Sequence, residues 1–215
     1  MHPNPAFRQT PAADNLAFAR SRGFGTLAVN AAATDSAGPL LSHLPFLLSE
    51  DGSTAECHLV RSNPIARALA TPQPAVLSVT GPEGYISPDW YGLDDQVPTW
   101  NYVAVHLRGT LELLPATALR DQLDRLSARF EAELAPKPQW TAAKMPEDLL
   151  ARMMRQIVPC RLTVTEVQGT WKLAQNKPEA ARLAAARAVA AAGRGPAAAE
   201  LARLMEEATL PPSSE

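Results

Sequence analysis

Short β-rich segments separated by turn residues constrain the fold of this 215-residue chain more than any other feature. Each segment is rich in aliphatic, β-branched or aromatic residues, and Gly, Pro, Asn or Asp follows within a few positions. Strands do not alternate regularly with helices, so a parallel sheet is not expected. We predict a small antiparallel barrel of six strands, at residues 25–30, 40–48, 55–60, 75–80, 99–114 and 157–167.

Helical periodicity is confined to segments between or after these strands. Capping residues and apolar residues at helical spacing predict four helices, at residues 14–21, 64–69, 117–135 and 146–156. The last two form a helical insertion at about residues 115–156. The predicted fold class is therefore α+β, mainly β, with helices at the periphery of the barrel.

After residue 177 the sequence is dominated by Ala, Arg and Leu in two helical stretches, which are interrupted at residues 193–196. Alanine favours helix strongly but offers little apolar area to bury. We therefore expect a barrel domain at residues 1–177 and a C-terminal helical extension at residues 178–210, packed on the barrel or on a partner subunit.

Charge, cysteine content and hydropathy exclude several functional classes. The net charge is −2, so no global basic field exists to attract nucleic acid. Cys57 and Cys160 match no metal or redox spacing, and we expect two small apolar residues in a reducing compartment. The chain shows no secretory signal and no apolar run of about 20 residues that would span a membrane, so a cytoplasmic location is expected. Common nucleotide, metalloprotease and hydrolase signatures are absent from the sequence.

The segment Ser42, His43, Leu44 and Pro45 places a proline inside a predicted strand. Proline cannot donate to the ladder, so hydrogen bonding between strands is interrupted there. A ligand-binding edge would explain this pattern, and so would an edge strand with exposed polar residues.

His58, Arg61 and Asn63 bring a cation to the start of a predicted helix. Free backbone N–H groups and the helix dipole favour an anion such as phosphate at that position. The alternative is a solvated Arg61 beside a histidine buried in the core.

Aromatic residues are concentrated in residues 85–102, which hold all three tyrosines and two of the four tryptophans. Amphipathic rings suit the wall of a site for a planar heterocycle or a subunit interface. Interleaved polar residues make a purely apolar core cluster the weaker alternative. The candidate ligand contacts in this region are Tyr85, Ser87, Trp90, Thr99, Trp100 and Asn101.

Donor-rich side chains follow the last predicted strand, at Lys172, Gln175 and Asn176. Lys172 could bind a phosphate or the polar edge of a heterocycle, and the two amides could pair with ring amides. A solvated junction in which Asn176 caps the following helix is the alternative.

Taken in order, these segments resemble the PaiB family of bacterial regulators. The resemblance spans about residues 1–187 and depends on the ordered set rather than on any one motif. The segments that carry it are His2–Phe7, Ser42–Leu47, His58–Pro64, Tyr85–Tyr91, Val97–His106 and Lys172–Lys177.

The resemblance implies an FMN-binding split barrel related to pyridoxamine-phosphate oxidase-like proteins. It also implies a homodimer that holds FMN between its subunits, and a role described as negative transcriptional regulation. The candidate FMN contacts are then Ser42, His43, Leu44, Pro45, His58, Arg61, Asn63, Tyr85, Ser87, Trp90, Thr99, Trp100, Asn101, Lys172, Gln175 and Asn176.

Three functions are compatible with such a barrel. The first is an FMN-dependent oxidoreductase or redox sensor that uses a small-molecule substrate or electron donor, although no catalytic residue can be assigned. The second is a DNA-binding repressor that uses arginines of the C-terminal helices, where alanine and glutamate dilute the positive charge. The third is a haem-binding protein with a histidine as axial ligand, for which a His-rich tail is lacking.

Overall fold

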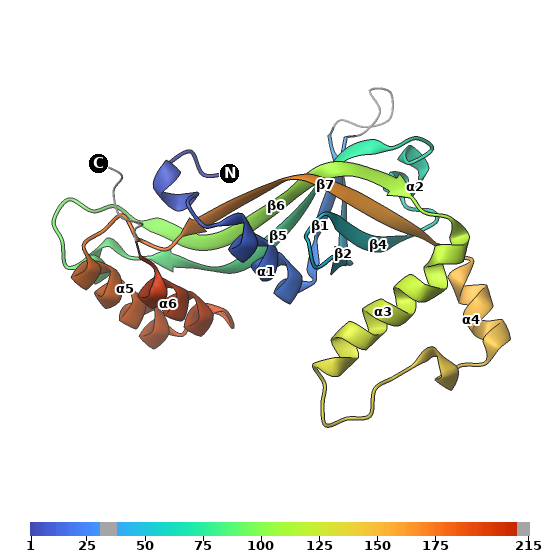
Figure 1. Cartoon of the computed structure of the whole chain (residues 1–215). Helices are drawn as coiled ribbons and strands as arrows, with labels where there is room; N and C mark the ends of the chain where they lie inside the picture. The colour runs from blue at the N-terminus through green and yellow to red at the C-terminus, as the bar shows by residue number, and fades with distance from the viewer. Residues whose placement is uncertain (31–37, 210–215) are drawn as a thin grey trace. The chain divides into compact units, whose positions relative to one another are not determined.

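The computed structural model describes residues 1–30 and 38–209. Its fold is α+β, with peripheral helices around an antiparallel sheet (Figure 1). Within the described residues the sheet has seven strands in the order β2-β1-β5-β6-β7-β4-β3. The strands are β1 (Phe24–Val29), β2 (Leu40–Pro45), β3 (Leu47–Leu48), β4 (Thr54–Val60), β5 (Gln73–Ile86), β6 (Thr99–Leu113) and β7 (Ile157–Lys172).

The chain divides into two compact units. Unit 1 comprises Met1–Phe18, Val79–His106 and Val167–Glu215, and unit 2 comprises Ala19–Ser78 and Leu107–Glu166. Strands β5, β6 and β7 each have residues in both units.

The predicted strand at residues 40–48 is two strands in unit 2, which raises the strand number from six to seven. β2 pairs with β1, with His43 opposite Thr26, whereas β3 pairs with β4. The division follows Pro45, which has no N–H to donate to the ladder. Phe46 is fully buried, and its backbone N–H donates to the Gly23 carbonyl at 2.9 Å. The small and glycine-containing sequence of residues 31–39 favours a turn before this strand, and residues 31–37 of it lie outside the described residues.

Strands β4 and β7 of unit 2 place Cys57 directly opposite Cys160. Both thiols are free and buried, as expected for small apolar core residues. A hydrogen bond with Cys160, together with burial, raises the pKa of the Cys57 thiol well above its usual range.

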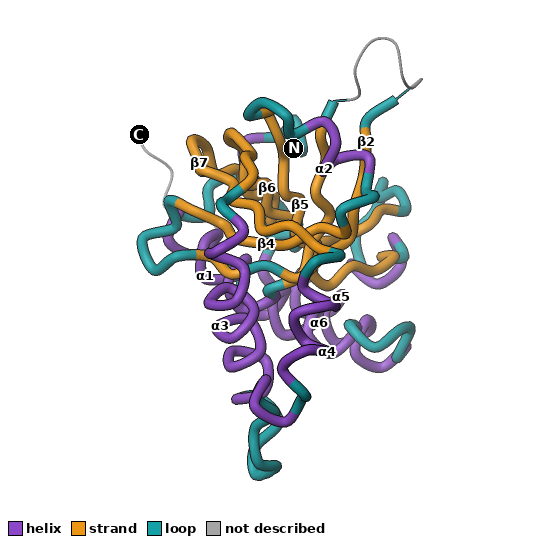
Figure 2. The backbone as a smooth tube through the Cα atoms, turned by 90° about the vertical axis from the view of Figure 1, so that its right-hand side faces the viewer, coloured by secondary structure: helices purple, strands orange, loops and turns teal. Residues whose placement is uncertain are grey.

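The predicted helical insertion is present in unit 2 as α3 (Leu119–Ala132) and α4 (Glu147–Met154) (Figure 2). Short 3₁₀ turns precede these two helices, η3 (Ala116–Ala118) and η4 (Ala142–Lys144). Helix α3 buries Leu126 and Gln122, and the Gln122 amide donates to the Cys160 carbonyl at 3.3 Å. Unit 2 also contains the predicted short helix α2 (Pro64–Ala68).

Strand β5 runs unbroken to Ile86, beyond its predicted end at residue 80. Residues 81–84, whose two glycines and proline favour a turn after that predicted strand, do not form one, so that prediction is wrong. Gly81 is needed there for close packing rather than for a turn. A Cβ at this position would lie 2.6 Å from the Phe18 ring and 3.0 Å from Val103. Strand β7 likewise extends beyond its predicted end at residue 167, as far as Lys172.

Unit 1 contains the C-terminal helices α5 (Glu179–Ala192) and α6 (Ala198–Glu207), which lie side by side (Figure 1). Gly193 ends α5 in the left-handed conformation, at φ +56°, which glycine adopts at little cost. The two helices pack against Ile86, Val103 and Leu173 around a shared hydrophobic core.

The N-terminal part of the chain forms η1 (Pro5–Phe7) and α1 (Ala12–Arg22), and η2 (Pro88–Tyr91) follows β5. Within the described ranges, every helix is too short or too polar to cross a membrane.

Candidate cofactor-binding site

The ends of β6 and β7 in unit 1 border a cavity of about 260 Å³. It brings together four residues predicted from the sequence as ligand contacts, namely Thr99, Asn101, Lys172 and Asn176. These residues come from two segments about seventy positions apart. The fold therefore brings together candidate contacts that the sequence predicted in separate segments.

Asn101 presents an unused hydrogen-bond acceptor in this unit. Its side chain is 1% exposed, and its Nδ2 donates to the Met205 sulfur at 3.5 Å. Its Oδ1 is buried and has no hydrogen-bond partner within residues 1–30 and 38–209. A buried acceptor left without a partner costs about 1–3 kcal/mol, so a ligand N–H at this atom would remove a real penalty.

Two lysines line the same cavity. Lys172 Nζ donates to Thr99 Oγ1, and partial burial lowers the pKa of Lys172 below its usual value. Lys177 Nζ donates to Gln96 Oε1 and lies 5.5 Å from the centroid of the Tyr91 ring. The lining of the cavity therefore contains two cationic donors together with Asn101, whose buried Oδ1 lacks a partner among the described residues.

The amide of Gln175 is occupied by main-chain groups rather than facing the cavity. Its Oε1 accepts from the Leu173 N–H at 2.8 Å, and its Nε2 donates to the carbonyls of Ala6 and Trp171 at 3.2 and 2.5 Å. Gln175 thus holds η1 against the end of β7. Asn176 is exposed and lines the cavity, and α5 has no side-chain cap from it.

The predicted aromatic residues of unit 1 separate into exposed and packed groups. Tyr85 and Trp100 are 41% and 56% exposed, and their rings meet edge to face with centroids 6.5 Å apart. Trp90 packs against the hydrophobic core that includes α5 and α6, which agrees with the alternative of an aromatic core cluster. Ser87 precedes η2 and is half-buried. Of these three aromatic candidates, Tyr85 and Trp100 offer the most area to a ligand or to another chain.

The other candidates lie in unit 2. Ser42 and His43 belong to the edge strand β2, where Ser42 Oγ accepts from Asn63 Nδ2 at 3.2 Å and His43 Nδ1 is 2.8 Å from Thr26 Oγ1. Leu44 is buried in the core, and Pro45 ends β2. The edge position agrees with both interpretations of this segment.

Asn63 caps α2 with its own side chain, because its Oδ1 accepts from the Ile65 N–H at 2.9 Å. Arg61 donates instead to the carbonyls of Arg155 and Ile157, at 3.0 and 3.4 Å. Burial lowers the pKa of His58, and the buried Nδ1 of that histidine has no partner in the described part of the chain. His58, Arg61 and Asn63 are therefore neighbours, as predicted, but their side chains contact different groups.

Sequence reasoning missed other residues that line the unit 1 cavity, among them Tyr91, Asp95, Gln96 and Lys177. Lys177 lies at the end of a segment already singled out, so its charge could have drawn attention to it. Asp95 and Gln96 lie in an irregular loop without a recognisable pattern. No group of three or more His, Cys, Asp or Glu side chains placed to hold a metal occurs among the residues that the structure describes.

Comparison with known proteins places the chain in a family. The family model described as "Putative FMN-binding domain" matches residues 1–166. The chain belongs to this family, which is the PaiB-like family indicated by the sequence motifs. The match ends before Lys172, so the family model says nothing about that lysine. Its candidate role is inferred from the geometry of the cavity.

The chain is similar to the protease synthase and sporulation protein PAI 2 of Bacillus subtilis. The two are 30% identical over 175 residues, which cover 80% of this chain and 81% of that protein. An uncharacterised protein of Emericella nidulans is 24% identical over 172 residues, covering 63% of this chain and 68% of the relative.

Two solved structures share the fold. An FAD and heme binding protein from Mycobacterium smegmatis is 20% identical with a TM-score of 0.54, covering 77% of this chain and 73% of that one. A conserved hypothetical protein from Mycobacterium tuberculosis is 15% identical with a TM-score of 0.55, covering 80% of this chain and 92% of that one. Family and fold together confirm the predicted split-barrel class.

Proposed function

We propose that this chain binds FMN and functions as a flavoprotein with a redox or redox-sensing role. The observation that carries the proposal is the pairing, in the lining of one cavity, of Asn101, whose buried Oδ1 has no partner among the described residues, with the cationic donor Lys172. The chain belongs to a family described by FMN binding, and this pairing fits the chemistry of FMN.

The hydrogen-bonding groups of FMN complement those of the cavity. The isoalloxazine ring carries one ring N–H between two carbonyl oxygens, so the N–H suits Asn101 and the oxygens suit the donors Lys172 and Thr99. The phosphate would suit the same cations. These residues would bind and orient the cofactor, and the bound flavin would supply the electron or hydride transfer.

The cavity can hold only one end of FMN. Its volume of about 260 Å³ lies below the range of about 300–1,000 Å³ that is usual for sites enclosing a whole ligand of this size. The rest of the cofactor would need further cover. The exposed pair Tyr85 and Trp100 supports the proposal that a second copy of the chain supplies it, in a homodimer with FMN between the subunits.

Direct DNA binding by the C-terminal helices is less well supported. Arg182 is buried and donates to the carbonyls of Met205 and Glu206, and Arg203 pairs with Glu207 at 2.6 Å. These two guanidinium groups are therefore engaged within the protein. A regulatory role would act through the flavin more readily than through a basic recognition helix.

A titration of the purified protein with FMN, followed by quenching of flavin fluorescence, tests the proposal. We expect saturable binding by the unmodified chain. Lys172→Gln should weaken it by about tenfold or more, because a hydrogen bond to a charged group contributes about 1.5–3 kcal/mol. Lys144→Gln, which alters an exposed lysine of unit 2, should leave the dissociation constant unchanged. Absence of quenching, or equal affinity in Lys172→Gln, would contradict the proposal.

A further inference from the structure

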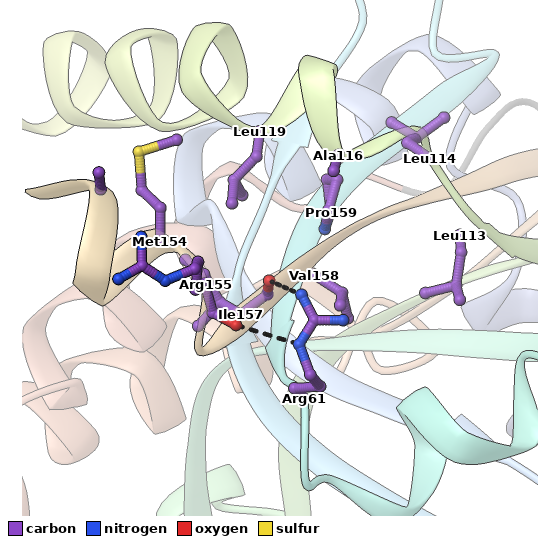
Figure 3. A pocket seen from close by; sticks show the side chains of 11 residues that line it. Arg61, Leu113, Leu114, Ala116, Leu119, Met154, Arg155, Ile157, Val158 and Pro159 are labelled. Atoms are coloured by element: carbon purple, nitrogen blue, oxygen red, sulfur yellow. Dashed lines mark hydrogen bonds between the residues drawn. The ribbon is translucent and has the colours of Figure 1, made fainter.

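A second cavity, of about 480 Å³, lies wholly within unit 2, where β6 and β7 meet the helical insertion (Figure 3). This volume is within the range of about 300–1,000 Å³ that is usual for small-molecule sites. Most of its lining is apolar, contributed by Leu113, Leu114, Leu119, Met154, Ile157 and Val158. Among the described residues, none that lines this cavity also lines the candidate flavin cavity of unit 1.

The charged side chains that line the cavity are both arginines, Arg61 and Arg155, and no acidic side chain is among its described lining residues. Arg61 is fixed in place, because its Nε donates to the Arg155 carbonyl at 3.0 Å and one terminal nitrogen donates to the Ile157 carbonyl at 3.4 Å (Figure 3). A fixed guanidinium is pre-organised to bind an anionic group. The cavity is therefore an apolar site with positive charge along its wall.

We propose that this cavity binds a small amphiphilic anion of the medium-chain carboxylate class. The hydrocarbon chain would contact the leucines and Met154, whose flexible thioether adapts to ligands of different shape. The carboxylate would face Arg61 and Arg155. A neutral apolar ligand would leave these charges unused, and a cationic amphiphile would be repelled by them.

Isothermal titration with matched ten-carbon probes tests the proposal on the full chain. We expect decanoate to bind once per chain, decanol to bind several-fold more weakly, and decyltrimethylammonium not to bind. Octanoate should bind about fifteenfold more weakly than decanoate, since it lacks two methylenes and each buried methylene contributes about fourfold in affinity. Equal binding of decanoate and decyltrimethylammonium, or no binding of either, would overturn the proposal.

Variants of α4 locate the site. Arg155→Gln should weaken decanoate by about threefold, as expected for a partly solvated charge pair, and should not affect decanol. Arg152→Gln, which lies within α4 whereas Arg155 is its C-cap, is outside the cavity lining; it is the matched control and should bind normally. Ala151→Trp should fill the cavity and abolish binding of both probes. Arg155→Gln keeps the test valid if Ala151→Trp misfolds, and unchanged decanoate affinity in Arg155→Gln would overturn the proposal.

The phosphate of FMN is another anion that Arg61 could bind. Repeating the decanoate titration on protein saturated with FMN separates the two ligands. Unchanged decanoate affinity would support an independent site in unit 2. Competitive displacement of decanoate by FMN would show that the cavity belongs to the flavin site, and would overturn the proposal.

Discussion

At the scale of single residues, a substitution of Asn101 distinguishes a role in FMN binding from a role in the stability of the fold. Asn101→Leu removes a buried acceptor that has no partner among the described residues, so the unfolding free energy without cofactor should be unchanged or higher by about 1 kcal/mol. The same variant should lose at least about tenfold in FMN affinity, because the ring N–H loses its acceptor. Urea unfolding and FMN titration measure the two effects. A stable variant with normal FMN affinity would contradict the assigned role.

Lys172 gives the binding reaction a predicted pH dependence. Burial lowers its pKa in the free protein, and a bound anionic or carbonyl group favours the charged ammonium and raises that pKa again. FMN affinity should therefore be full below the lowered free-state pKa and fall as the pH rises through it.

Titrations between about pH 7 and about pH 10 test this dependence. Lys172→Arg keeps its charge throughout this range, so its affinity should change much less with pH. A steep fall in Lys172→Arg equal to that of the unmodified chain would assign the effect to another group.

At the scale of secondary-structure elements, one buried arginine connects the two C-terminal helices. Arg182 of α5 is 6% exposed and donates to the last carbonyls of α6, including that of Glu206 at 2.8 Å. Arg182→Met keeps the aliphatic packing but removes these charge-assisted bonds, so it should lower the unfolding free energy by about 1–3 kcal/mol. Arg187→Met changes an exposed arginine of the same helix and should cost less than about 0.5 kcal/mol. Urea unfolding compares them, and equal losses would contradict the connecting role.

Most elements could be predicted because their signals are local. The spacing of apolar residues predicted α3, and the Asn-Pro pair at positions 63 and 64 predicted α2 with its cap. The unbroken course of β5 could not be predicted, since Gly81 accommodates Phe18, a residue distant in sequence. The division at Pro45 likewise depends on pairing with two different strands.

The sequence could predict which segments contribute to the candidate site, but not which contacts their side chains make. Lys172 was identified among donor-rich residues after the last predicted strand, and Asn101 among polar residues interleaved with aromatic ones. The fold places both in the lining of one cavity. The part played by Gln175 was not predictable, because its bonds to Ala6 and Trp171 exist only after the N-terminus has packed. Lys177 was missed because its pairing with Gln96 arises from the tertiary structure.

At the scale of the whole molecule, the central claim is that the folded chain retains FMN, and the homodimer proposal adds that two chains share the cofactor sites. Gel filtration of protein incubated with FMN, monitored by absorbance and light scattering, measures retention and mass together. We predict that flavin absorbance elutes with the protein, at twice the chain mass of 23.0 kDa. Flavin that elutes entirely as free cofactor, apart from correctly folded protein, would contradict the claim.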